Sequence, residues 1–308
     1  MSFFIYRLGQ ALASMLGRRR SYWLADRVAD LRFAFSCRNR GIVERNLSAV
    51  LHADGREKES GSCREIFRQF SRNVSDFLLI DRLDGDFIRS HVKVQGKEHL
   101  ETALARGKGA LLVSGHVGGW ELGAGIVSRL GYDVSVLALP HATPEVTAYF
   151  NRRRSAAGVH TVSTQFGLRR CLELLKENKL VAILGDKDFT GGQGVWVDFF
   201  GRKAEFPKGP AALALKSGAA FVPVFSLRDN EDGYVFSIEP PIAAPVTGEI
   251  EREILYLTAR FAHILEKVIA SHPFQWTLFL PMWPTGALDS AGASGRRSYE
   301  PLRSDSGV

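Results

Sequence analysis

A histidine and a glutamate near the middle of the chain have the residue types and spacing for proton transfer. His116 and Glu121 lie in the stretch SGHVGGWELG, residues 114–123, directly after the apolar run 110–113. On one continuous helix, residues five apart point about 140° away from each other. The two side chains therefore meet only if His116 lies in a turn and Glu121 lies in the first turn of the helix that follows. Gly118 and Gly119 favour such a turn, because glycine adopts backbone angles that other residues avoid.

This arrangement predicts a general base that is oriented by a carboxylate. Glu121 would accept a hydrogen bond from Nδ1 of His116, which fixes the tautomer and lets Nε2 take a proton. The chain contains no G-x-S-x-G, P-loop, G-x-G-x-x-G or H-E-x-x-H pattern, so we expect the pair to activate a hydroxyl of the substrate. The spacing is common by chance, and a turn histidine beside a carboxylate is the purely structural alternative.

The elements that must position this pair alternate between strands and helices. Strands are predicted at 110–113, 134–139, 180–184, 195–199, 221–227 and 234–238, and helices at 120–130, 145–157, 168–176, 210–216 and 249–270. The alternation predicts an α/β fold with a mixed, mainly parallel sheet flanked by helices. Ligands of such folds gather at the carboxyl ends of strands, and His116 follows one of these ends.

The beginning of the chain predicts an N-terminal amphipathic helical region. Apolar residues recur with helical period in two stripes, which are Phe4, Leu8, Leu12 and Met15, and then Leu24, Val28, Leu31 and Phe35. Nine arginines and three acidic residues lie between positions 1 and 45. Neither stripe provides the roughly 20 apolar residues of a membrane span, and no cleavable signal peptide is expected. Such helices suit an anionic membrane surface, and packing against the main domain is an equally compatible role.

Composition places the chain among globular proteins with an acidic partner. Its 308 residues are 45% hydrophobic and 24% charged, with a net charge of +7. We expect an N-terminal helical, membrane-surface region at 1–90, an α/β domain at 91–285 and a flexible tail at 286–308. The three cysteines form no C-x-x-C pair, so neither a disulfide framework nor a metal site is expected. No nucleic-acid-binding motif is present, and we expect no nucleic acid as partner.

Several blocks of the sequence carry a family resemblance. The chain resembles the lysophospholipid acyltransferase superfamily, and within it the bacterial lipid A biosynthesis acyltransferases of the lauroyl/myristoyl type. Related mycobacterial mannoside acyltransferases share the pattern. The H-x4-D/E motif of the superfamily matches His116 to Glu121. The further blocks follow in family order as YFNRRRSAAGVHTV (149–162), VAILGDKDFTGGQGVWVDFFG (181–201), AEFPKGPAALALKSGAAFVPVF (204–225) and FQWTLFLPMW (274–283).

The resemblance implies a glycerol-3-phosphate acyltransferase-like fold and a direct acyl transfer without an acyl-enzyme. His116 would deprotonate an acceptor hydroxyl that attacks an acyl thioester, and Glu121 would orient and charge-balance the imidazole. Backbone N–H groups of the turn at Gly118 and Gly119, or a nearby cation, would stabilise the oxyanion.

The same resemblance implies the residues that bind the acceptor. The family arginine maps onto Arg154, four residues before Gly158, with Arg152 as its neighbour. Arg154 would bind an acceptor phosphate, for which a guanidinium is well shaped. The acidic position of the third block maps onto Asp186, with Asp188 as the alternative. Asp186 would position the acceptor or hold an arginine.

The resemblance also implies partners and location. The donor would be the thioester of acyl carrier protein or coenzyme A, and no cofactor besides this co-substrate is expected. The acceptor would be a membrane lipid or glycolipid, such as a lipid A precursor or a phosphatidylinositol mannoside. The protein would work on the cytoplasmic face of the bacterial inner membrane, as a peripheral or monotopic protein. An acyl thioesterase or lipid hydrolase is one alternative, and a non-catalytic basic protein that binds membrane or nucleic acid is another.

Overall fold

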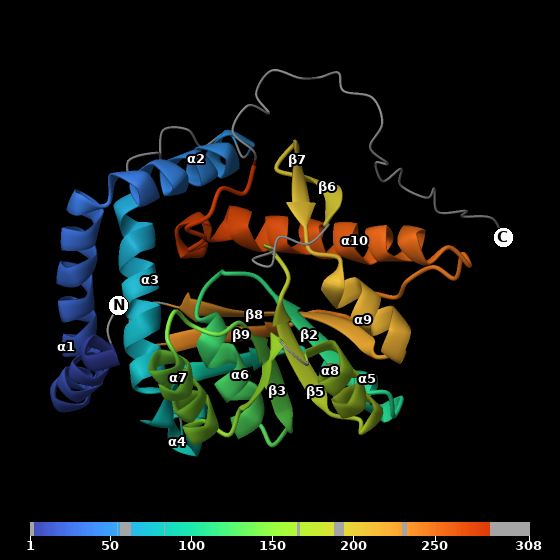
Figure 1. Ribbon diagram of the computed structural model, residues 1–308, viewed down its shortest axis with the longest axis horizontal. Helices are drawn as coiled ribbons and strands as arrows, with labels where there is room; N and C mark the ends of the chain where they lie inside the picture. Colours follow the sequence, from blue (N-terminus) through green and yellow to red (C-terminus); the bar gives the residue numbers. More distant parts are fainter. Residues whose placement is uncertain are drawn as a thin grey trace.

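The computed structural model is built on one central β-sheet, and it describes residues 3–53, 55, 63–82, 84–164, 167–187, 194–229 and 233–283 (Figure 1). The sheet has seven strands in the order β1-β9-β8-β2-β5-β3-β4. Strands β8, β2, β5, β3 and β4 run parallel to one another, whereas β9 is antiparallel to β8 and β1 runs parallel to β9. Strands β6 and β7 form a separate antiparallel hairpin.

The elements follow one another with short connections. The strands are β1 (Val92–Gln95), β2 (Ala110–Ser114), β3 (Val134–Ala138), β4 (His160–Ser163), β5 (Leu180–Leu184), β6 (Val195–Phe199), β7 (Arg202–Phe206), β8 (Ala220–Asp229) and β9 (Gly233–Ile238). The helices are α1 (Phe3–Phe35), α2 (Cys37–Ala53), α3 (Cys63–Leu78), α4 (Gly85–His91), α5 (Lys97–Ala105), α6 (Trp120–Arg129), α7 (Pro144–Ala156), α8 (Gly167–Lys176), α9 (Gly209–Ser217) and α10 (Ile250–Ser271). Two 3-10 turns, Ile80–Arg82 and Pro273–Gln275, complete the described elements.

The predicted fold class is confirmed, since the sheet is mixed, mainly parallel and flanked by helices after an N-terminal helical region. The predicted strands and helices all appear close to their expected bounds. Sequence patterns missed β1, β4 and β7, together with α5, whereas α4 lies almost entirely within the region 1–90 that was expected to be helical. The missed strands are short and carry polar residues, as in VKVQ for β1 and the charged stretch RKAEF for β7, so none contains a continuous apolar run. The predicted tail, 286–308, lies outside the described residues.

Alternating side chains of the strands build a separate hydrophobic core on each face of the sheet. In β2, Leu111 and Val113 point to the core that α8, α9 and α10 cover. Ala110 and Leu112 point to the opposite core, which α5 and α6 cover. A parallel sheet that is covered on both faces explains why its strands read as continuous apolar runs.

Strands β3 and β5 pair along only part of their lengths. Their last paired residues are Val136 and Ala182, although β3 continues to Ala138 and β5 to Leu184. Over this stretch β3 remains paired with β4, and β5 remains paired with β2. The ladder therefore ends between the carboxyl-terminal halves of two central strands, at the edge where α/β folds bind ligands.

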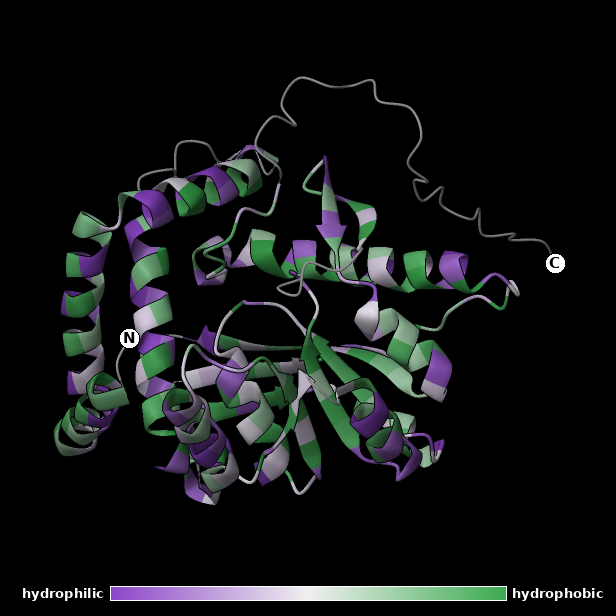
Figure 2. Ribbon diagram, viewed as in Figure 1, coloured by the Kyte–Doolittle hydropathy of each residue, from purple (hydrophilic) through white to green (hydrophobic). Residues whose placement is uncertain are grey.

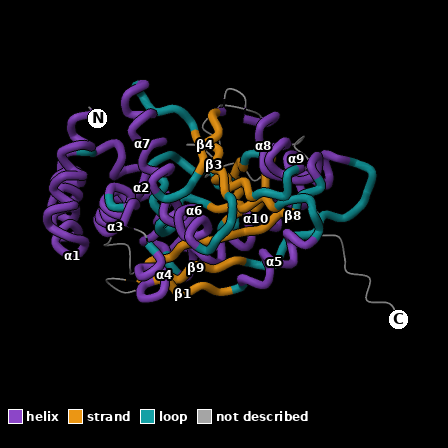
Figure 3. Tube along the Cα trace, turned by 90° about the horizontal axis from the view of Figure 1, so that it is seen from below, coloured by secondary structure: helices purple, strands orange, loops and turns teal. Residues whose placement is uncertain are grey.

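The N-terminal helices pack beside the sheet, with α3 next to α1 (Figure 1 and, seen from below, Figure 3). Helix α1 is broken at Gly17, whose backbone has φ of 72°. Apolar side chains of α1, α2 and α3 form a third cluster, which Phe274 and Phe279 join from the end of the chain. No helix among the described residues is both long and apolar enough to cross a membrane. The domain boundary after residue 90 stays a prediction.

A buried ion-pair network ties α1 and α3 to the sheet. Asp76 of α3 is 6% exposed and pairs with Arg228 of β8 at 2.8 Å. Arg18 and the hydroxyl group of Tyr22, both from α1, donate to the same carboxylate at 3.2 and 2.5 Å, and Tyr234 of β9 also donates to it. Burial alone would raise the pKa of Asp76, but the two arginines and the tyrosine hydroxyls outweigh burial and lower it.

We predict that Asp76→Ala strongly destabilises the protein, because it leaves the Arg228 guanidinium buried without its carboxylate. Breaking a buried ion pair in this way costs about 3–5 kcal/mol in free energy of unfolding, measurable by urea-induced unfolding. Since the folded-state pKa of Asp76 is lowered, the stabilisation is present at neutral pH and is lost as the pH falls below about 4.

The control is Asp86→Ala, which removes an exposed carboxylate paired with Arg89 on α4 and should leave stability unchanged. Equal unfolding midpoints for Asp76→Ala and Asp86→Ala would contradict the importance of the network.

Candidate active site

His116 lies in the turn between β2 and α6, as its spacing from Glu121 predicts. Strand β2 ends at Ser114, α6 begins at Trp120, and Glu121 lies in the first turn of that helix. The carbonyl group of His116 accepts a hydrogen bond from the Thr277 N–H at 2.8 Å. The predicted placement of the histidine at the carboxyl end of a strand is confirmed.

The two glycines of this turn are bound to the rest of the fold. Gly118 has φ of 60°, and a Cβ at this position would lie 2.1 Å from the carbonyl oxygen of Ser226, so only glycine fits. The N–H of Gly118 donates to the carbonyl of Gln275 at 2.9 Å, and the N–H of Gly119 donates to that of Ser226 at 2.7 Å. Asn73 of α3 donates to the carbonyl of Gly118. The sequence led us to expect these two N–H groups to bind the substrate by stabilising the oxyanion. That expectation is wrong, because each N–H already donates to a carbonyl group of the protein.

The carboxylate that orients His116 is Asp186, which follows β5. Nδ1 of His116 lies 2.7 Å from Oδ1 of Asp186, and the backbone N–H of His116 donates to Oδ2 at 2.8 Å. The indole N–H of Trp276 donates to the same Oδ2 at 3.3 Å. Asp186 is completely buried. Burial would raise its pKa, but the charge and hydrogen bonds of His116 and the bond from Trp276 lower it, which favours the carboxylate form.

Glu121 has a different partner from the one that the spacing suggested. Its carboxylate oxygens accept hydrogen bonds from Arg154 of α7, at 3.0 Å from Nε and 2.6 Å from one terminal nitrogen. The Nδ1 hydrogen bond expected between His116 and Glu121 is made to Asp186 instead. Asp186 follows β5, the strand next to β2, and lies directly beside His116, whereas Glu121 on α6 faces α7.

The three arginines of α7 have different environments. Arg154 is 6% exposed, and its guanidinium makes a two-point contact with Glu121 while it lines the cavity; its binding of an acceptor phosphate stays a prediction. Arg153 pairs with Asp81 at 2.6 Å. Arg152 is exposed to solvent. Asp188, the alternative acidic position, lies outside the described residues.

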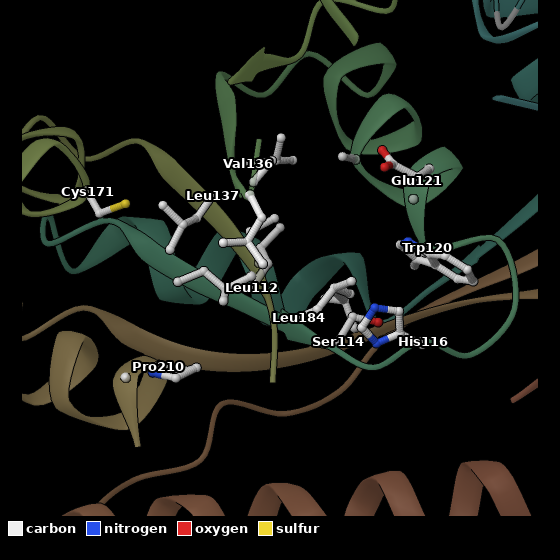
Figure 4. A pocket seen from close by; sticks show the side chains of 18 of the residues that line it. Leu112, Ser114, His116, Trp120, Glu121, Val136, Leu137, Cys171, Leu184 and Pro210 are labelled. Carbon is white, nitrogen blue, oxygen red and sulfur yellow. The ribbon is translucent and has the colours of Figure 1, made fainter. Parts of the chain in front are cut away.

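His116, Glu121 and Arg154 line one cavity of about 670 Å³. Figure 4 shows His116, Trp120 and Glu121 on one side of it, across from Leu112, Val136 and Leu137. The lining is mostly apolar and comes from both hydrophobic cores, with Val127 and Phe236 from the α6 side and Cys171 and Leu213 from the α8 and α9 side. Residues beyond the last β3–β5 pair, including Leu137 and Leu184, also line it.

Three further residues of the cavity with basic side chains, Lys187, Lys208 and His141, were not predicted as site residues from the sequence. Lys187 and Lys208 lie in blocks that carry the family resemblance, and this resemblance could have pointed to them as residues near the site. His141 stands alone in the sequence, and only the fold brings it beside Glu121 and Arg154. Its ring lies 3.9 Å from that of Phe150, between centroids, and burial and the charge of Arg154 lower its pKa. Within the described ranges, no group of three or more His, Cys, Asp or Glu residues forms a metal-binding cluster.

The chain is similar to known acyltransferases over most of its length. A family model described as bacterial lipid A biosynthesis acyltransferase matches residues 1–285. A phosphatidylinositol mannoside acyltransferase of Mycobacterium tuberculosis is 32% identical over 209 residues, which cover 66% of this chain and 63% of that protein. The protein with the same description in Mycolicibacterium smegmatis is 27% identical over 90% of each chain. A lipid A biosynthesis acyltransferase of Haemophilus influenzae is 33% identical over 47% of this chain and 46% of that protein.

The family model's match, residues 1–285, includes the turn with His116, the strand that leads to Asp186 and the helix that carries Arg154. The resemblance found in the sequence blocks is confirmed by the family model. The chain belongs to the bacterial lipid A biosynthesis acyltransferase family.

Proposed function

We propose that the protein transfers a fatty acyl chain from an acyl thioester to a hydroxyl group of a membrane glycolipid. The observation that carries this proposal is the position of His116 on the wall of a large apolar cavity, with its Nδ1 held by the buried Asp186 behind it. A histidine held at Nδ1 by a buried carboxylate is suited to accept a proton at Nε2. The apolar lining is suited to an alkyl chain, and the relatives are described as a lipid A biosynthesis acyltransferase and as phosphatidylinositol mannoside acyltransferases.

The proposed reaction proceeds in a ternary complex and needs no nucleophile from the protein. Nε2 of His116 takes the proton of the acceptor hydroxyl while the hydroxyl oxygen forms a bond to the thioester carbonyl carbon. Asp186 stabilises the imidazolium that results. The tetrahedral intermediate then breaks its carbon–sulfur bond, and the departing thiolate receives the proton from Nε2. The positive end of α6, which begins at Trp120 next to His116, favours the negative charge on the intermediate oxygen.

We assign the acyl chain to the part of the cavity beneath α6. Leu112, Val127 and Phe236 line it there, and all three side chains are almost completely buried. Gly123 and Ala124 of α6 also line this part of the cavity. The opposite part includes the exposed Leu168, which suits an entrance better than a closed end.

The remaining polar residues support the proposed partners. Lys187 and Lys208 bring positive charge to the cavity, which suits the acidic acyl carrier protein or the phosphates of coenzyme A as donor carrier. The Glu121–Arg154 pair joins the first turn of α6 to α7 and thereby stiffens the helix beside His116. A soluble donor and a lipid acceptor place the protein, in this proposal, at the cytoplasmic face of the bacterial inner membrane as a peripheral protein.

The direct test of the function is His116→Ala. Loss of the general base should lower kcat for acyl transfer by about 10²–10⁴ in a variant that circular dichroism shows to be folded. The assay follows a radiolabelled acyl chain from acyl carrier protein and from coenzyme A into lipid A precursor or phosphatidylinositol mannoside. Near-normal turnover by the variant would contradict the proposed role of His116. Release of free fatty acid at the same rate without any acceptor would identify a thioesterase instead.

Two isosteric variants separate the roles of the two carboxylates. Asp186→Asn places an amide beside Nδ1, which disfavours the tautomer that leaves Nε2 as proton acceptor, so kcat should fall nearly as far as in His116→Ala. Glu121→Gln keeps the shape of the side chain but loses the charge that faces Arg154, and we expect a smaller loss of kcat. The measurement is the pH profile of kcat for both variants. If kcat fell further in Glu121→Gln than in Asp186→Asn, Glu121 and not Asp186 would be the carboxylate that orients His116.

The position of the acyl chain is tested by filling each part of the cavity in turn. Ala124→Leu narrows the space beneath α6 and should shift the preferred donor to a shorter chain, seen as a fall in kcat/KM for long acyl thioesters alone. Cys171→Leu adds similar volume on the α8 side and is the matched control, for which the preference should stay the same. A shift caused by Cys171→Leu and not by Ala124→Leu would place the chain on the other face of the sheet.

A further inference from the structure

The cavity reaches both faces of the central sheet. On the face that α6 covers, its wall includes Leu112 and Phe236. On the face that α8 and α9 cover, its wall includes Cys171 and Leu213. Figure 4 shows Cys171 on the opposite side of the cavity from Trp120 of α6. We call these two parts of the cavity the α6 arm and the α8 arm.

The two arms join where two strands of the sheet separate. The β3–β5 ladder ends at Val136 and Ala182, although both strands continue. The next residues, Leu137 and Ile183, pack with the core under α8 and α9, and both line the cavity. Figure 2 shows mostly hydrophobic residues along the central strands. A closed sheet would separate the two cores, so a single cavity reaches both of them through the opening between β3 and β5.

The junction of the arms lies next to the proposed base. Leu184, the last residue of β5, lines the cavity beyond the end of the β3–β5 ladder. It pairs with Ser114 of β2, which is two residues before His116. Asp186, two residues after Leu184, binds Nδ1 of His116. Substrates that approach from opposite faces of the sheet can therefore meet at Nε2.

A direct acyl transfer requires both substrates in the site at the same time. The α6 arm is assigned to the acyl chain of the donor, so a chain of the acceptor needs a space of its own. The α8 arm provides an apolar wall that includes Leu137, Cys171 and Leu213. Leu168 also lines it and is 57% exposed, so this arm opens to the outside. Burial of methylene groups against such a wall is favourable.

The other chain that could enter the α8 arm is the pantetheine of the donor. Pantetheine carries two amide groups, and burying an amide without a hydrogen-bond partner is costly. The side chains of Leu137 and Leu213 offer no partner, and the thiol of Cys171 is only a weak donor or acceptor. The wall of this arm therefore suits an alkyl chain better than pantetheine.

We infer that the cavity binds two alkyl chains at once, the acyl chain of the donor in the α6 arm and a chain of the lipid acceptor in the α8 arm. This inference deepens the proposed function and rests on it for the roles of the two chains. The acceptor is then recognised by its alkyl part as well as by the group that carries its hydroxyl. An acceptor whose alkyl chains have been removed should be a poor substrate.

The first test counts the alkyl chains that the full-length protein binds without any transfer. Myristic acid is the probe, and native mass spectrometry and isothermal titration calorimetry measure its stoichiometry and affinity. The wild type should bind two molecules. Ala124→Leu fills the α6 arm and Cys171→Leu fills the α8 arm, so each should weaken one of the two binding steps about tenfold or more.

The matched control is Ala53→Leu, which adds the same volume as Ala124→Leu to an exposed position at the end of α2. It should bind two molecules with the affinities of the wild type. Circular dichroism establishes that each variant is folded. The double variant Ala124→Leu/Cys171→Leu should lose both binding steps, because the two arms are filled independently.

The second test assigns the chains to the two substrates. Cys171→Leu should raise KM for an intact glycolipid acceptor at least about fivefold and leave KM for the donor unchanged. Ala124→Leu should raise KM for a long-chain donor and leave KM for the acceptor unchanged. The wild type should use deacylated phosphatidylinositol mannoside with a kcat/KM at least about tenfold below that of the intact glycolipid.

Three results decide the inference. A wild-type chain that binds a single molecule of myristic acid, or two molecules whose binding is unchanged in a folded Cys171→Leu variant, would overturn it. Pantetheine that displaces one of two bound molecules would overturn it as well, because the α8 arm would then belong to the donor. Two binding steps that respond to the two variants as expected, in a protein that transfers no acyl chain, would instead refute the proposed function and leave the two arms established.

Discussion

The buried carboxylate of Asp186 is the interaction on which the rest of the site depends. It binds both the side chain and the backbone of His116, and it receives a third hydrogen bond from Trp276. A carboxylate removed from water in this way remains charged only because these donors surround it. The chain therefore brings together three distant segments, the end of β2, the end of β5 and the segment after α10, around one negative charge. These contacts around Asp186 fix the orientation of the His116 ring.

The sheet supplies the second requirement, which is room for an alkyl chain next to a fixed base. The β3–β5 ladder ends at Val136 and Ala182, and the cavity occupies the space beyond it. Gly118 lets the turn pass within contact distance of β8, and the Glu121–Arg154 pair holds α6 against α7. Each of these features keeps the cavity open or keeps the base beside it. The Asp76 network extends the same rigidity to the N-terminal helices, and Asn73 links that network to the turn through Arg228 and Gly118.

Much of the fold could be predicted from the sequence, because continuous apolar runs alternate with helical periods. The turn at His116 was also predictable, since five residues and two glycines leave few conformations. The partner of His116 was not predictable from spacing, because Asp186 is 70 positions away and only strand pairing brings it close. The Glu121–Arg154 pair joins residues 33 positions apart, and spacing did not predict it because only the fold brings α6 and α7 together. The apolar stripes of α1 were visible, but which side faces solvent depends on the ion pairs between α1 and α3.

The central claim is that Asp186 fixes His116 as the neutral tautomer with its proton on Nδ1, so that Nε2 accepts the proton of the acceptor. The most direct measurement is ¹⁵N nuclear magnetic resonance of the His116 ring in protein labelled at histidine, at a pH where the ring is neutral. The structure predicts a protonated Nδ1 and an unprotonated Nε2 in the wild type, and loss of this preference in Asp186→Asn. A proton on Nε2 in the wild type, or the same tautomer in both proteins, would contradict the account.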